Sequence, residues 1–267
     1  MKRKPPAPRT SRRTSRITRA TPAGRTAKRP SRTAAAEIPT PTPAAAGLIA
    51  HIAPFAVFFG IWALGELLAS VLGPGAGWWH SHPQYWIFPL QTLAAGYTLY
   101  HFWPLQRWQP PTRPVWWLGA GIAIFLLWIA PQEVFAAAPR LDGFRPDFAQ
   151  EGWLRILHIA LRWLRLVVVV PMIEEIFWRG FVPRYVAQAD FQQLPLEKFQ
   201  PLGFGISTLC FALSHWGPDF FCALCAGAVY GFVACKSGRL SSCVLAHALT
   251  NLLLGIYLTL SGQWGFW

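Results

Sequence analysis

The chain has 267 residues, of which 53% are hydrophobic and only 13% are charged, and it contains fifteen Trp and nineteen Phe. Soluble domains carry about 25% charged residues, so this composition excludes an ordinary soluble domain and predicts a polytopic membrane protein with aromatic belts. The formal net charge of +13 does not indicate a nucleic-acid-binding protein, because twelve of the 24 Lys and Arg residues lie within residues 1–32.

Residues 1–46 form a basic segment rich in Pro, Ser, Thr and Ala, in which Glu37 is the first acidic residue. Such a segment has too few apolar side chains to fold, so we predict a disordered tail. Three interpretations of it stay open: an arm that fixes topology and touches anionic head groups, a cleaved organelle transit peptide, or a nucleic-acid-binding segment. The charges have no interleaved aromatic residues and no folded module beside them, so we expect no nucleic-acid partner.

Residues 47–267 are predicted to form an all-α transmembrane bundle of about seven spans, with six or eight as alternatives. The apolar runs are 48–72, 85–105, 114–131, 156–178, 202–215, 221–235 and 241–260. Lys and Arg gather in alternate loops, which the positive-inside rule places in the cytoplasm together with the N-terminus. We therefore expect an integral protein of a bacterial inner membrane with its C-terminus outside.

Small residues are frequent in the last spans. Gly227 and Gly231 are four residues apart on one helix face, a spacing that lets a neighbouring helix approach closely. The five cysteines are Cys210, Cys222, Cys225, Cys235 and Cys243. All lie in apolar segments, where a free cysteine behaves as a small hydrophobe, so we expect a role in helix packing.

Three polar patterns interrupt the apolar C-terminal half of the chain. They are Glu174 and Glu175 with Arg179, Phe211 with His215, and His247 with Asn251. An ionisable side chain in hydrocarbon costs roughly 2.5–3.5 kcal/mol on insertion scales, so such residues rarely lie in spans without a task. The patterns therefore predict an active site inside the membrane. Because Arg179 directly follows the predicted fourth span, we expect this site toward the cytoplasmic side.

The two adjacent glutamates are predicted to have different roles. On a helix they point about 100° apart, whereas Glu175 and Arg179 share one face in the geometry of an ion pair. Glu174 then projects elsewhere and is a candidate general base.

The two histidine patterns place polar groups on one helix face each. Phe211 can pack beside the His215 imidazole, and His247 and Asn251 can donate to developing negative charge. Two histidines and a carboxylate could also bind zinc, although the chain has no His-Glu-x-x-His motif. The residues alone leave metal and metal-free chemistry open.

Taken in order, Glu-Glu-x-x-x-Arg, Phe-x-x-x-His and His-x-x-x-Asn resemble the motifs of the CAAX-protease and bacteriocin-processing family. This is a family of intramembrane endopeptidases that includes the Ras-converting enzyme, and the resemblance covers residues 156–260. The sequence around the motifs, for example residues 177–181 and 246–253, resembles that of a bacterial branch of the family. This branch accompanies exosortase-type protein-sorting systems.

The resemblance implies an intramembrane peptidase acting on a membrane-associated protein or peptide. Glu174 and His215 would activate water, and His247 and Asn251 would stabilise the oxyanion. Glu175, Arg179 and Phe211 would support them. A metal-free mechanism is favoured, with zinc held by Glu174, His215 and His247 as the alternative. Expected partners are membrane lipids, the substrate and a protein-sorting system. The alternative function is a non-proteolytic scaffold or immunity-type protein of the same fold.

Overall fold

The computed structural model describes residues 43–72, 82–145 and 152–266. The chain divides into two units, Met1–Thr40 and Pro41–Trp267, and all described residues belong to the second unit. The predicted tail, residues 1–46, therefore lies outside the described residues except for its last four positions, which begin the first helix.

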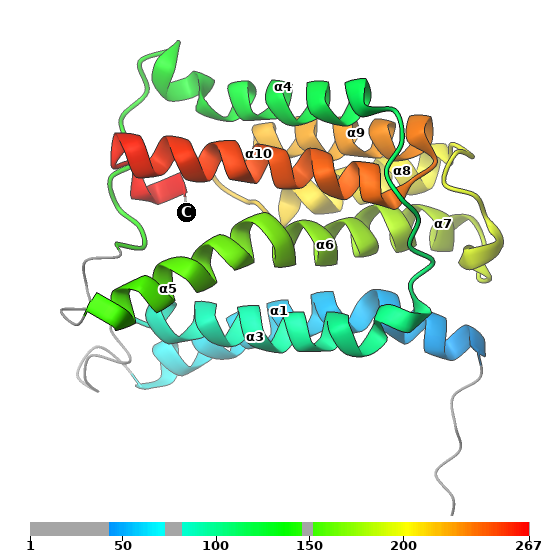
Figure 1. Ribbon diagram of the computed structural model, residues 1–267, viewed down its shortest axis with the longest axis horizontal. Helices are drawn as coiled ribbons and strands as arrows, with labels where there is room; N and C mark the ends of the chain where they lie inside the picture. Colours follow the sequence, from blue (N-terminus) through cyan, green and yellow to red (C-terminus); the bar gives the residue numbers. More distant parts are fainter. Residues whose placement is uncertain (1–42, 73–81, 146–151, 267) are drawn as a thin grey trace, which may run out of the picture. The chain divides into compact units, whose positions relative to one another are not determined.

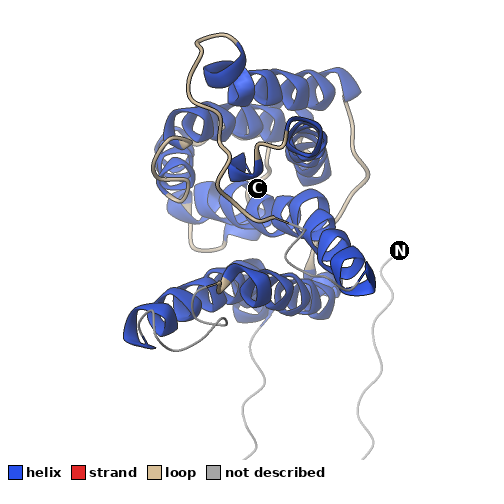
Figure 2. Cartoon of the chain, turned by 90° about the vertical axis from the view of Figure 1, so that its left-hand side faces the viewer, coloured by secondary structure: helices blue, strands red, loops and turns tan. Residues whose placement is uncertain are grey.

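All regular structure in the described ranges is helical, which confirms the predicted all-α fold class (Figure 2). The α-helices are α1 (Pro43–Leu72), α3 (Gln84–Phe102), α4 (Pro114–Glu133), α5 (Gly152–Leu164), α6 (Val170–Glu175), α7 (Val182–Ala187), α8 (Pro201–Leu213), α9 (Phe220–Ser237) and α10 (Leu240–Ser261). Two π-helical stretches, Arg165–Val169 and Ile176–Phe181, join α5, α6 and α7 into one continuous helix. Short 3-10 turns lie at Trp103–Leu105, Phe191–Gln193 and Trp264–Phe266.

Within the described ranges, five helical segments are long and apolar enough to cross a membrane. They are Ala45–Val71, Pro114–Glu133, Gly152–Ala187, Phe220–Ser237 and Leu240–Ser261. Helix α3 has 19 residues but carries more polar side chains. Helix α8 has 13 residues, about 20 Å, which is less than the ~30 Å hydrocarbon thickness. The polytopic membrane bundle is thus confirmed, while the count of seven crossings stays a prediction.

The continuous helix α5–α7 runs between the α1–α3 pair and the group of α4, α8, α9 and α10 (Figure 1). It contributes to two buried clusters. Val169 and Ile173 pack with Phe58 on α1, whereas Trp178 packs with residues of the other group, including Phe211. The helix that carries the first motif is therefore covered on two sides by protein, which lets its ionisable side chains avoid lipid.

Small residues allow close helix contacts, as the spacing of Gly227 and Gly231 predicted. A Cβ at Gly227 would lie 3.2 Å from the Thr208 carbonyl oxygen on α8, and one at Gly121 would lie 2.9 Å from the Ala246 carbonyl oxygen on α10. Helices α8 and α9, and α4 and α10, therefore approach backbone to backbone at these positions, which suits a bundle packed without a hydrophobic driving force.

Each π-helical stretch of the long helix is followed by one valine and then by a proline. The N–H of Val170 bonds the carbonyl of Arg165 before Pro171, and the N–H of Val182 bonds the carbonyl of Phe177 before Pro183. Proline cannot donate and its ring clashes with the carbonyl four residues back, so widening the turn relieves the clash. Single π-helical turns of this kind are frequent at functional sites. Here they lie on both sides of Glu174 and Glu175.

Candidate active site

A cavity of about 590 Å³ lies within the bundle and brings together all four predicted catalytic side chains. Glu174, His215, His247 and Asn251 line it, although they come from two helices, α6 and α10, and from the turn after α8. The remaining wall is largely aromatic. This volume is sufficient for water and a stretch of peptide, because ligand pockets commonly measure about 300–1,000 Å³.

Glu174 presents an unsatisfied carboxylate to this cavity. The residue is only 4% exposed, and its Oε2 atom has no hydrogen-bond partner within the described residues. Arg165, which precedes it in the same long helix, also lines the cavity and attracts the carboxylate electrostatically. A buried acceptor without a partner is costly, so its presence beside a roomy cavity favours a role in binding a proton donor such as water.

The Glu175 carboxylate, by contrast, has hydrogen-bond or ion-pair partners on both of its oxygens. Its Oε1 atom lies 2.8 Å from Arg179 Nη1, which confirms the predicted ion pair, and 2.8 Å from His247 Nδ1. The Cys243 thiol donates to Oε2 over 2.8 Å. Arg179 is itself held by the Gly227 carbonyl at 3.3 Å and by the Phe211 ring, 4.4 Å from the guanidinium carbon. A fully buried carboxylate with these contacts stabilises the architecture and is unavailable as a base.

His215 is oriented by the end of α8. Its Nδ1 lies 2.9 Å from the Phe211 carbonyl oxygen, and its ring packs 4.7 Å from the Phe211 ring, as the spacing predicted. A carbonyl only accepts, so Nδ1 carries the proton and Nε2 of the neutral ring is left as an acceptor. No hydrogen bond joins His215 to Glu174 among the described residues, and the cavity that both line is large enough to hold water.

His247 and Asn251 lie on α10 and face the same cavity. Because Glu175 accepts from His247 Nδ1, the free Nε2 atom of this ring becomes a donor when the imidazole is protonated. The Asn251 amide donates one N–H to the Leu166 carbonyl at 2.9 Å and retains a second. Each residue therefore keeps one group for a ligand.

Sequence reasoning missed three members of the site. Cys243 was assigned to helix packing, yet its thiol bonds Glu175. Tyr230 stacks on His247 at 5.1 Å, and Arg165 faces Glu174. Cys243 precedes His247 by four residues, so a shared helix face was the available signal for it.

The residues proposed for zinc do not form a metal-binding cluster in this arrangement. Among the described residues, no three His, Cys, Asp or Glu side chains come together as ligands. His247 Nδ1 is engaged by Glu175, and His215 Nδ1 is engaged by a backbone carbonyl. We therefore derive no step through a metal.

The cavity lies toward the end of the bundle away from the basic loops. Phe88 near the start of α3, Trp128 near the end of α4 and Asp219 before α9 line it, whereas Arg107 and Arg239 do not. The expected position near the cytoplasmic end was based on a fourth span ending at residue 178. That boundary was wrong, because the helix continues to Ala187 and buries Arg179 within its length.

Comparison with known proteins gives one family match, over the part of the chain that carries the three motifs. Residues 156–253 match the family model described as type II CAAX prenyl endopeptidase Rce1-like. No curated protein and no solved structure matches the chain. The matched range contains all three motifs and therefore every predicted catalytic residue. The segment 156–253 thus matches the Rce1-like family of type II CAAX prenyl endopeptidases, in agreement with the resemblance that its three motifs indicated.

Proposed function

We propose that this protein is an intramembrane endopeptidase that hydrolyses a peptide bond in a membrane-associated protein or peptide. One observation carries the proposal. Glu174, whose Oε2 atom has no hydrogen-bond partner among the described residues, lines a large cavity together with His215, His247 and Asn251, inside the segment that matches the family. A buried carboxylate oxygen without a partner among the described residues, in a cavity that His215 also lines, favours binding of water over a purely structural role.

In this mechanism Glu174 accepts a proton from a water that is also held by His215 Nε2. The water oxygen forms a bond to the scissile carbonyl carbon, and the carbonyl oxygen becomes the oxyanion. When the tetrahedral intermediate collapses, the carbon–nitrogen bond breaks. The proton held by Glu174 then passes to the leaving amine. No group outside the chain and the water is needed to balance the step.

The oxyanion would be stabilised by the remaining N–H of Asn251 and by protonated His247. The Glu175 carboxylate, 2.8 Å from His247 Nδ1, would hold that imidazole in place and stabilise its positive charge. Loss of one such donor lowers the rate of other hydrolases by about 100- to 1,000-fold. Glu175 and Arg179 are thus positioning residues rather than catalytic ones.

The setting of the reaction is also a proposal. We place the protein in a bacterial inner membrane with its N-terminus in the cytoplasm, in association with a protein-sorting system. The basic loops support this orientation, and the cavity would then lie in the outer half of the bundle. The competing scaffold function would leave the Glu174 carboxylate without a chemical task.

New protein N-termini in membranes report the activity even while the substrate is unidentified. Cells expressing wild-type protein, Glu174→Gln or His215→Ala at equal abundance are compared by N-terminal labelling and mass spectrometry. Glu66→Gln is the matched control, because this glutamate is exposed in α1 and does not line the cavity. We expect a set of termini in wild-type and Glu66→Gln membranes that is absent from both other variants.

Two outcomes would count against the proposal. Unchanged termini in Glu174→Gln would remove the assigned base. A biological phenotype that survives Glu174→Gln, with no termini dependent on the wild-type protein, would shift the function to a scaffold.

A further inference from the structure

A second hollow, of about 310 Å³, lies at the opposite, basic end of the bundle. Three arginines line it: Arg107 after α3, Arg184 on α7 and Arg239 before α10. The one acid on its lining is Glu197, which is exposed, so the lining carries a surplus of positive charge. We refer to it as the arginine hollow.

None of these arginines forms an ion pair with a described carboxylate. Arg107 donates to the Gln192 carbonyl at 3.3 Å, and Arg239 donates to the Gly238 carbonyl at 3.1 Å. Arg184 donates to the carbonyls of Gly180 and Leu194. Backbone contacts fix the guanidinium groups but do not neutralise them, and Arg107 and Arg184 repel each other electrostatically. Like charges held together in this way favour an anionic ligand.

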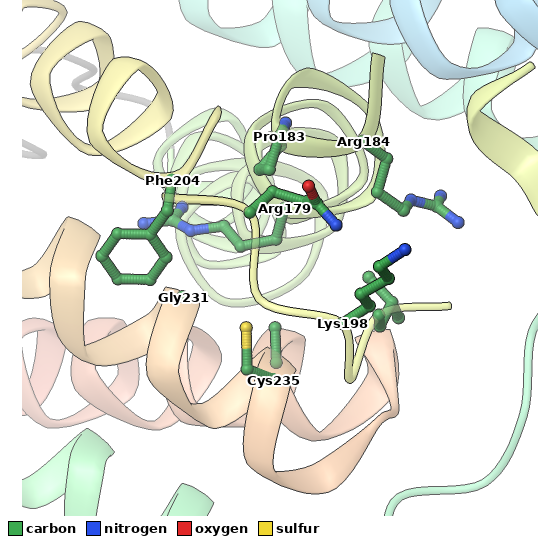
Figure 3. A pocket seen from close by; sticks show the side chains of 10 residues that line it. Arg179, Pro183, Arg184, Lys198, Phe204, Gly231 and Cys235 are labelled. Carbon is green, nitrogen blue, oxygen red and sulfur yellow. The ribbon is translucent and has the colours of Figure 1, made fainter. Parts of the chain in front are cut away.

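Two tryptophans near the arginine hollow suit a position at the level of lipid head groups. Trp103 and Trp108, whose rings are 5.2 Å apart, stand beside it, and tryptophan is enriched at membrane interfaces. Trp108 lines a narrower pocket of about 70 Å³ that shares Arg107 and Arg184 with the hollow. A third small pocket adds Lys198 next to Arg184 (Figure 3). The charge is therefore grouped between helix ends and beside Trp108, a residue type that is enriched at membrane interfaces.

We propose that the arginine hollow binds the phosphate of an anionic membrane lipid. Arginine forks match phosphate oxygens, and basic pockets between transmembrane helices on the cytoplasmic side are suited to lipid head groups. The positive-inside rule places this end of the bundle in the leaflet that is rich in anionic lipids. The site contains none of the residues assigned to peptide hydrolysis and does not depend on that function.

Binding of defined lipids to the purified full-length protein tests this directly. Affinity for phosphatidylglycerol, phosphatidylcholine and inorganic phosphate is measured for wild-type protein and for Arg107→Gln, Arg239→Gln and the double variant. Arg184 is left intact because it also bridges two backbone carbonyls. Lys236→Gln is the matched control, since it removes an exposed charge at the same end and lines none of these pockets.

We expect selective binding of phosphatidylglycerol, weakened about fivefold for each arginine removed and unchanged in Lys236→Gln. Equal binding of phosphatidylcholine, or equal affinity of the double variant and the wild-type protein, would overturn the proposal. Binding of inorganic phosphate with the same arginine dependence would support the anion site and assign it to a soluble phosphate. An unchanged melting temperature of the arginine variants in lipid-free detergent shows that they are folded.

Discussion

Two adjacent glutamates have opposite environments in this protein. Glu175 is fully buried and shares its carboxylate among Arg179, His247 and Cys243. Glu174 faces the cavity, and one of its oxygens has no partner within the described residues. A glutamate side chain therefore stabilises the structure at position 175, whereas the one at position 174 is available for chemistry.

This difference predicts separate effects of the two glutamine variants on stability. Glu175→Gln leaves the Arg179 charge buried and uncompensated, and we expect a loss of about 3–5 kcal/mol in the free energy of unfolding. Glu174→Gln breaks no hydrogen bond to the described residues, so its stability should change by less than about 1 kcal/mol. Denaturant or thermal unfolding in detergent measures both values. Equal stability of the two variants would contradict the assigned roles.

The sequence was informative about single residues only where a contact lies within one helix. The spacing of Glu175 and Arg179, and of Phe211 and His215, predicted both observed pairs. It could not predict that His247 and Cys243 reach Glu175, because those contacts depend on how α10 packs against α6. They join residues 72 and 68 positions apart.

At the scale of elements, close helix contacts bring the polar side chains into range of one another. Gly121 on α4 lies against the backbone of α10, and its carbonyl accepts a 2.9 Å hydrogen bond from Thr250. Thr250 in turn accepts from the Tyr230 hydroxyl at 2.6 Å. Helix α10, which carries His247 and Asn251, is therefore held at a fixed distance from α4 and α9.

Gly121→Ala should disturb this contact, whereas Gly119→Ala should not. A Cβ at Gly121 would lie 2.9 Å from the Ala246 carbonyl oxygen, while one at Gly119 would meet nothing within 4 Å. Both changes replace glycine by alanine in the same helix, so their helix propensities are matched. We expect Gly121→Ala to lower the free energy of unfolding by about 1–3 kcal/mol and Gly119→Ala to leave it unchanged or raised. Parallel unfolding measurements decide this, and equal effects would contradict the proposed close contact.

The sequence predicted the number of helices better than their ends. Apolar runs and their Pro- or Gly-marked breaks gave seven helices, and the described ranges contain seven once α5–α7 is counted as one. The long helix nevertheless extends beyond the predicted 156–178 at both ends. Hydropathy marks the length in contact with lipid, and protein contacts on two sides let this helix continue through polar residues such as Arg179 and Arg184.

For the whole molecule, the two cavities lie at different ends of the bundle. The cavity beside Glu174 is lined by Trp128 and Asp219, and the arginine hollow by Arg107 and Arg239. If the basic end faces the cytoplasm, the proposed hydrolysis would occur in the outer half of the membrane and the proposed lipid binding at the inner surface.

Reporter fusions test this orientation. A reporter active only in the cytoplasm should be active when inserted between α3 and α4 near Pro110, and inactive when fused after Trp267. A reporter active only outside should give the reverse pattern. The opposite result at both positions would invert the topology and place the catalytic cavity in the cytoplasmic half.

The most direct test of the central claim is the cleavage rate of the purified protein on a substrate identified by its new terminus. After chelator treatment and removal of bound metal, we predict that the wild-type protein retains its rate. We predict that Glu174→Gln, although folded, loses about 100- to 10,000-fold, the range expected for a general base. Undiminished cleavage by Glu174→Gln, or activity that is lost with the metal and restored by zinc, would contradict the proposed glutamate-activated water.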